Sequence, residues 1–210
     1  MTTYKQLNKN ITRQTALTNA VKALTKFRSK ACCVRNSYVR EVYSYLTSKG
    51  TDYDEYFANQ LEPNTIKLWE SFHNSCVERK SAKDLKVYYL SGPEPENDFQ
   101  VLVNSGVNPY NIWAFESDNR VYNQAISAIK KSRFPMLKLH KGSIEQFFIN
   151  TPKKFDIIYI DGCGPLPSQS QNTLRLVSTI FRHHRLTPLG ALITNFSRPD
   201  ITDPIQLNNC

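Results

Sequence analysis

The spacing of hydrophobic residues changes near residue 84 of the chain. Before that point the apolar positions of Ala16–Phe27, Val39–Leu46 and Ile66–Cys76 recur every three to four residues. This spacing places apolar side chains on one face of a helix. We therefore predict that residues 1–82 form a helical region that contributes no strand.

After residue 84, short apolar runs alternate with stretches of helical spacing. Each run is too short for a buried helix and is bounded by polar residues or glycine. The five runs are Val87–Leu90, Ile112–Phe115, Met136–Leu139, Ile157–Ile160 and Ala191–Thr194. The helical stretches are Asp98–Asn104, Asn119–Lys131, Ser143–Asn150 and Gln171–His184. Strands that alternate with helices indicate βαβ units, so residues 83–210 are predicted to form a doubly wound α/β domain with a mainly parallel, five-stranded sheet.

The bulk composition is that of an ordinary globular protein, with 40% hydrophobic and 21% charged residues. The sequence has no run of apolar residues long enough to predict a transmembrane helix, and no apolar segment typical of a secretory signal follows the start. None of the five cysteines forms a C-x-x-C pair or a metal-ligand spacing. We therefore expect reduced thiols, no metal site, no membrane association and a cytoplasmic protein.

Positive charge is concentrated at the N-terminus. The net charge is +9, and residues 1–40 hold nine basic side chains and no acidic one, whereas the rest of the chain is neutral. Such an arm attracts the phosphate backbone of RNA or DNA, which predicts a nucleic acid partner. Two alternatives remain open. The arm is also typical of an organelle presequence, or of a solvated helix face whose acidic partners lie in another segment or chain.

The segments that follow the first four predicted strands meet at one edge of the sheet. In a doubly wound sheet, ligands bind beyond the carboxyl ends of the strands, near the point where the strand order reverses. The segments there are Ser91–Glu96, Glu116–Asp118, Lys141–Ser143 and Asp161–Pro165. Taken singly, the glycine after the first strand is typical of a turn, and the two acids after the second suit a helix start. Their common position favours a ligand site.

The ordered series "KVYYLSGPEPENDF", "NIWAFESDNRVYNQAISAI", "LKLHKGSIEQFF", "FDIIYIDGCGPL" and "GALITNF" resembles class I S-adenosylmethionine-dependent methyltransferases. The resemblance covers residues 84–197. It includes a degenerate glycine-rich loop, in which only Gly92 remains and Pro93, Glu94 and Pro95 take the other places. It implies a Rossmann-like sheet in the order 3-2-1-4-5 and S-adenosylmethionine as the cofactor.

The resemblance also implies roles for individual residues. Gly92 would allow a tight backbone turn under the methionine part of the cofactor, and Glu94 would reach its ammonium group. Glu116 would accept hydrogen bonds from the ribose hydroxyls. Gly142 and Ser143 would lie against the adenine. Asp161 would lie at the end of the fourth strand and face both the donor methyl and the acceptor, which makes it the candidate catalytic residue.

Three hypotheses for the function follow. The first is an S-adenosylmethionine-dependent methyltransferase that acts on nucleic acid held by the basic arm. The second is a catalytically silent binding or scaffold module with the same fold, favoured by the glycine-poor loop. The third, a nicotinamide dinucleotide enzyme, is weaker because the G-x-G-x-x-G fingerprint is absent.

The length of the chain bears on the edge of the sheet. The sheet of the family continues for two more strands after "GALITNF", but only 13 residues follow Ser197. The sequence therefore predicts either a fragment of a longer protein or a five-stranded sheet. In either case the exposed edge needs a cover, from a missing C-terminal segment or from a protein partner.

Overall fold

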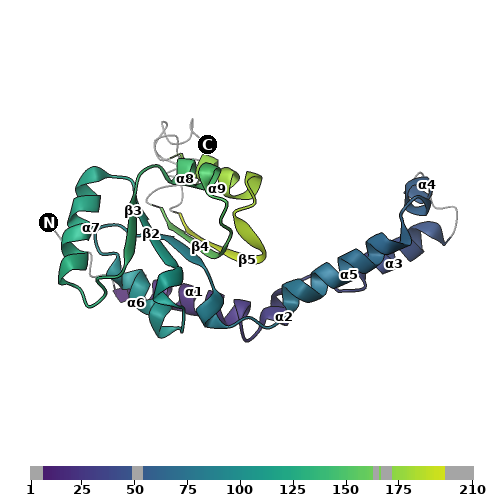
Figure 1. The fold of residues 1–210 in the computed structure, drawn as a ribbon, viewed down its shortest axis with the longest axis horizontal. Helices are drawn as coiled ribbons and strands as arrows, with labels where there is room; N and C mark the ends of the chain where they lie inside the picture. The colour runs from purple at the N-terminus through teal and green to yellow at the C-terminus, as the bar shows by residue number, and fades with distance from the viewer. Residues whose placement is uncertain (1–6, 49–53, 163–165, 167–171, 197–210) are drawn as a thin grey trace.

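The fold is built on five parallel strands. The structure, a computed structural model, describes residues 7–48, 54–162, 166 and 172–196. The strands are β1 (Val87–Leu90), β2 (Ile112–Glu116), β3 (Lys138–Lys141), β4 (Phe155–Asp161) and β5 (Leu186–Asn195). They are paired in the order β3-β2-β1-β4-β5, and every pairing is parallel (Figure 1). The predicted doubly wound α/β sheet and its strand order are confirmed.

The described residues before β1 are helical and add no strand to the sheet, as predicted. The α-helices there are α1 (Leu7–Leu24), α2 (Arg28–Ala31), α3 (Tyr38–Thr47), α4 (Asp54–Asn59) and α5 (Pro63–Val77). Between the strands lie α6 (Glu96–Asn104), α7 (Asn119–Lys131), α8 (Ile144–Asn150) and α9 (Thr173–Arg182). Two short 3-10 turns, η1 (Ala82–Asp84) and η2 (Pro109–Asn111), lead into β1 and β2. None of the helices in the described ranges is long and apolar enough to cross a membrane.

Two strands begin elsewhere than the hydrophobic runs indicate. β3 starts two residues after Met136, whose side chain is 44% exposed. β5 starts at Leu186 rather than at Ala191, because its pairing with β4 is irregular. Phe155 lies opposite Leu186 and Ile157 lies opposite Ala191. β5 therefore has more residues than β4 between these two pairs, and they form a bulge in β5. Proline and glycine within that bulge interrupt the apolar run and conceal the start of the strand.

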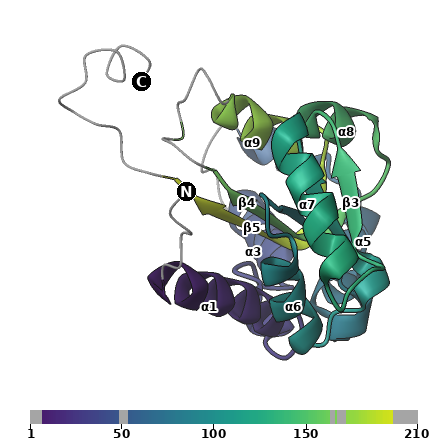
Figure 2. The same ribbon diagram turned by 90° about the vertical axis from the view of Figure 1, so that its left-hand side faces the viewer.

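Helices cover both faces of the sheet (Figure 2). Alternate residues of a strand point to opposite faces, and the two faces hold separate apolar clusters. One cluster contains Val87 and Tyr89 of β1 with side chains of α1, α6 and α7. The other contains Tyr88 of β1 with aromatic and aliphatic side chains of α8 and α9. The result is a three-layer sandwich in which the strands are buried on both sides.

Helix α1 belongs to the core of this sandwich. Its buried side chains Leu17, Ala20, Val21 and Leu24 pack in the same cluster as α6 and β1. The first helix of the basic N-terminal region thus completes the face of the sheet that α6 leaves uncovered. The division of the chain near residue 82 stays a prediction.

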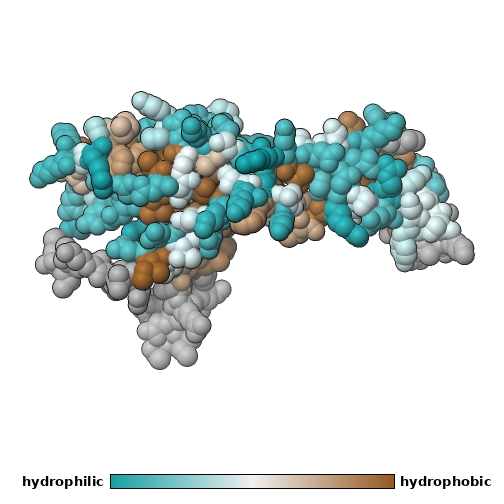
Figure 3. All heavy atoms as spheres, turned by 90° about the horizontal axis from the view of Figure 1, so that it is seen from below, coloured by the Kyte–Doolittle hydropathy of each residue, from teal (hydrophilic) through white to brown (hydrophobic). Residues whose placement is uncertain are grey.

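Helices α3 and α5 form a two-helix stalk (residues 38–47 and 63–77) that leads away from the sheet, with α4 at its far end (Figure 1). Arg40 and Glu70 join the two helices by an ion pair of 2.7 Å, and the indole nitrogen of Trp69 donates to the Asn36 carbonyl at 3.1 Å. Hydrophobic groups interrupt the largely hydrophilic surface of the stalk (Figure 3). Its large exposed apolar side chains include Tyr38, Val42, Tyr45, Leu68 and Phe72.

Candidate functional site

The carboxyl edge of the sheet, where β1, β2 and β4 end, holds a backbone turn with open space beside it. After β1, the Ser91 amide donates to the Phe115 carbonyl at 3.0 Å. Gly92 then takes a φ of +61°, and among the described residues no heavy atom other than its chain neighbours lies within 4 Å of the position of a Cβ atom there. The positive φ explains why glycine stands here, and the empty surroundings leave room for a ligand against the backbone.

Glu116 ends β2 on the same face of the sheet as α1 and α6. Its Oε1 accepts from the backbone amide of Asp118 at 2.8 Å, and Asp118 in turn caps α7 by accepting from the Val121 amide at 2.8 Å. The expected helix-capping role therefore falls to Asp118. Glu116 is half-buried, and its Oε2 makes no hydrogen bond within the described residues. That oxygen can accept from a ligand.

The loop after β3 is tied to the end of β2, because the Gly142 amide donates to the Glu116 carbonyl at 3.3 Å. Ser143 caps α8 by accepting from the Gln146 amide at 3.3 Å. Glu94 is exposed in the loop before α6 and accepts from the Asn97 side chain at 2.9 Å. Among the predicted residues, Glu94 and Ser143 are thus engaged in local contacts.

Asp161 ends β4 and binds two side chains. Its Oδ1 accepts from the Asn195 amide group at 2.9 Å, since Asn195 lies opposite it at the end of β5. Its Oδ2 forms an ion pair of 2.9 Å with Lys9 of α1, and the Asp161 side chain is 13% exposed. The basic N-terminal helix therefore reaches the carboxylate that the sequence marks as catalytic.

A second ion pair joins α1 to this region. The Arg13 Nε lies 2.6 Å from Oδ1 of Asp98, in the first turn of α6, and both side chains are largely buried. Burial raises the pKa of Asp98 from 3.8 to about 7, although Arg13 lowers it, and nearby Asp161 raises it further. Burial and the same two carboxylates raise the pKa of Tyr159. Asp98 and Asp161 are two acidic side chains near the neutral Tyr159 hydroxyl, and Arg13 and Lys9 partly neutralise their charge.

The edge can hold a polar ligand that carries hydroxyl groups. It offers space at Gly92, a carboxylate oxygen at Glu116 and a carboxylate at Asp161 on three adjacent strands. In the part of the chain that the structure describes, no group of three or more His, Cys, Asp or Glu side chains is placed to hold a metal ion.

Several basic residues of residues 1–40 have acidic partners further along this same chain. Besides Lys9 and Arg13, Arg40 pairs with Glu70 and Arg35 pairs with Glu41. Arg28 is buried and donates to the Leu24 and Leu189 carbonyls. Fewer unpaired basic side chains of residues 1–40 are therefore left for an external partner than the sequence alone suggests.

Neither a protein-family model nor a curated protein matches the chain. Similar solved structures include the CcbJ methyltransferase from Streptomyces caelestis, at 11% identity over 54% of this chain and 43% of that one, with a TM-score of 0.40. A SAM-dependent methyltransferase from Agrobacterium tumefaciens is 15% identical over 71% of this chain and 50% of that one (TM-score 0.40). An S-adenosylmethionine-dependent methyltransferase from Clostridium acetobutylicum is 20% identical over 75% and 55% (TM-score 0.38).

The chain spans about half the length of these three proteins. The sheet order is a property of the chain itself and rests on its own strand pairing.

Replacing Lys9 by alanine should change the free energy of unfolding by less than about 1 kcal/mol, because the Lys9 side chain is 39% exposed and solvent screens such a pair. Urea unfolding of the wild type and of Lys9→Ala measures the difference. A loss well above this value would mean that the pair holds α1 on the sheet.

Proposed function

We propose that this protein is an S-adenosylmethionine-dependent methyltransferase that acts on nucleic acid. The observation that supports it best is the open turn at Gly92, which follows the strand between those that end in Glu116 and Asp161. In open α/β sheets this position, where the strand order reverses, is where ligands bind.

The residues of the carboxyl edge fit the parts of this cofactor. The turn at Gly92 lets the backbone approach the methionine part, and the Oε2 atom of Glu116 accepts from the ribose hydroxyls. Gly142, with a φ of +136°, and the start of α8 at Ser143 lie beside Glu116 and border the adenine. Glu94, which is exposed at the same loop as Gly92, faces the ammonium group.

S-adenosylmethionine supplies a methyl group that is already activated by a sulfonium. The chain has to hold the acceptor in line with it and, for a protonated acceptor, to take up a proton. Asp161 is the residue for this task. Both of its oxygens are engaged, by Asn195 and Lys9, so an acceptor has to displace Lys9 to reach Oδ2. The exposed position of Lys9 makes this displacement inexpensive.

The silent module remains the second candidate, and the contacts of Asp161 and Ser143 favour it. Lys9 neutralises Asp161 and the Gln146 amide engages Ser143 without any ligand. These two residues are engaged within the chain and need no cofactor for stability.

Isothermal titration with S-adenosylmethionine, followed by a transfer assay with a radiolabelled methyl group on RNA and DNA, tests the proposal. We expect binding at one site per chain and label in one of the two nucleic acids. Binding without transfer to either would favour the silent module. Absence of binding would overturn the proposed cofactor.

A further inference from the structure

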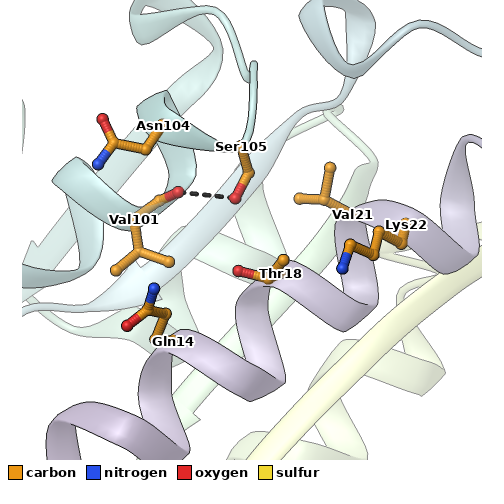
Figure 4. A pocket seen from close by; sticks show the side chains of 7 residues that line it. All are labelled: Gln14, Thr18, Val21, Lys22, Val101, Asn104 and Ser105. Atoms are coloured by element: carbon orange, nitrogen blue, oxygen red, sulfur yellow. Dashed lines mark hydrogen bonds between the residues drawn. The ribbon is translucent and has the colours of Figure 1, made fainter.

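A groove lies between α1 and α6, away from the carboxyl edge, and the apolar side chains of Val21 and Val101 line it together with five polar ones. It has a volume of about 370 Å³, which is within the range of ligand pockets. Figure 4 shows the side chains that line it from both helices. Its polar lining consists of Gln14, Thr18 and Lys22 from α1 with Asn104 and Ser105 from the end of α6. These groups offer amide and hydroxyl hydrogen bonds and one positive charge, but the Ser105 hydroxyl already donates to the Val101 carbonyl at 2.8 Å. No carboxylate of the described residues lines the groove.

Lys22, which lines the groove, is the first of three lysines spaced by four residues along the chain. Gln14, Thr18 and Lys22 are spaced by four residues along α1, so they share one side of the helix. Lys26 and Lys30 follow at the same spacing, in the turn after α1 and in α2. We call Lys22, Lys26 and Lys30 the lysine stripe. All three are exposed, and none forms an ion pair with another residue that the structure describes.

An exposed aromatic ring lies within the lysine stripe. Phe27 is 41% exposed, and the ammonium groups of Lys26 and Lys30 lie 5.4 Å and 5.9 Å from its ring centroid. The next residue, Arg28, is buried and bonded to the Leu24 and Leu189 carbonyls, which anchors the turn that carries Phe27. The ring is thus held at the surface by a neighbour fixed in the fold.

We propose that the lysine stripe, Phe27 and the groove together bind a single-stranded nucleic acid. Surfaces for single strands combine a positively charged track for the backbone with aromatic rings on which bases stack. The lysines supply the track, Phe27 supplies the ring, and the amides and hydroxyls of the groove supply hydrogen bonds for a base or sugar. An acidic peptide would use the charges but would gain little from the ring and from the uncharged amide and hydroxyl groups of the groove.

This inference rests on the proposed function, in which a nucleic acid is the methyl acceptor. It adds the surface of the protein along which the single strand lies. Lys22 and Lys9 are thirteen residues apart on α1, which is about 20 Å along a helix. A strand held on the lysine stripe therefore has to follow α1 for about this distance to bring a base to Lys9 and Asp161 at the carboxyl edge.

Binding of fluorescein-labelled 20-nucleotide single strands, one RNA and one DNA, to the full chain without cofactor tests the proposal. Fluorescence anisotropy between 50 and 300 mM salt gives the affinity and its salt dependence. With three phosphate contacts, log K should fall with log salt with a slope of about −2 for the strand that binds. The triple variant Lys22→Gln, Lys26→Gln, Lys30→Gln should lose most of this slope, and Phe27→Ala should weaken binding roughly tenfold.

The control variant Lys67→Gln, Lys130→Gln, Lys131→Gln removes the same charge from exposed positions elsewhere. It should keep the affinity and slope of the wild type. Equal losses in both triple variants would show that net charge alone attracts the strand and would overturn the inference, as would a wild type that binds neither strand. Binding of an acidic peptide that competes fully with the strand would also contradict it. Titration with S-adenosylmethionine separates these outcomes from failure of the proposed activity, because the lysine stripe lies outside the cofactor residues.

Discussion

Replacing Glu116 by alanine should weaken the binding of S-adenosylmethionine roughly 100-fold, about 3 kcal/mol. Hydrogen bonds to a charged acceptor are worth about 1.5–3 kcal/mol each, and the ribose presents two hydroxyls to one carboxylate. The Oε2 atom of Glu116 accepts no bond within the described residues, and Oε1 accepts from the Asp118 amide. Isothermal titration of the wild type and of Glu116→Ala measures the ratio of the two dissociation constants.

Two further variants make this result specific. Glu116→Gln keeps an acceptor oxygen and removes the charge, so its affinity should lie between those of the wild type and the alanine variant. Glu145→Ala removes an acid at the start of α8 that pairs with Arg175 at 2.7 Å, and it should leave the affinity unchanged. If the wild type binds the cofactor and Glu116→Ala binds it equally well, Glu116 is only an acid at a helix start.

Much of the fold follows from the hydrophobic pattern. β1, β2 and β4 are central strands, buried on both faces, so an unbroken apolar run marks each of them. The two edge strands are less predictable. β3 is made of Lys138–Lys141 and carries a half-exposed, mixed pattern, and the bulge hides the first half of β5.

The candidate site divides in the same way. The common position of Gly92, Glu116 and Asp161 at one edge of the sheet could be predicted because a strand end is a local feature of sequence and the topology brings strand ends together. Lys9 and Arg13 could not, since their partners lie about 150 and 85 residues away in the sequence. One feature of the sequence does indicate an acidic partner for Arg13. Arg13 stands four residues before Leu17 and continues the apolar stripe of α1, and a cation on a buried face needs an acidic partner.

Helix α1 links the core, the carboxyl edge and the lysine stripe. Its apolar face packs on the sheet through Leu17 and Leu24, its first turns carry Lys9 and Arg13, and its far end carries Lys22. Deleting residues 1–40 would therefore remove part of the core together with the charges. Point variants on the exposed side of α1 separate these roles.

The stability of the protein should depend on pH through Asp98. Its pKa rises to about 7 in the folded chain, mainly because of burial, so the folded state holds a proton that the unfolded state releases above pH 3.8. A group that binds its proton more tightly in the folded state adds stability at low pH, and this contribution is lost as the pH rises through the folded pKa. Each unit of difference is worth about 1.4 kcal/mol, so the loss between pH 4 and pH 7 amounts to at most about 4 kcal/mol.

Asp98→Asn isolates this contribution, because asparagine resembles the protonated carboxyl group and does not titrate. Urea unfolding of both proteins between pH 4 and pH 8 gives the difference in their free energies of unfolding, in which the other titrating groups largely cancel. The wild type should lose stability relative to the variant as the pH rises to about 7, with little change above it. The Arg13 guanidinium, 2.6 Å from the Asp98 carboxylate, lowers the pKa of Asp98 and so opposes the effect of burial. If the wild type instead gains stability relative to Asp98→Asn over this range, the ion pair with Arg13 outweighs burial and Asp98 is charged in the folded protein.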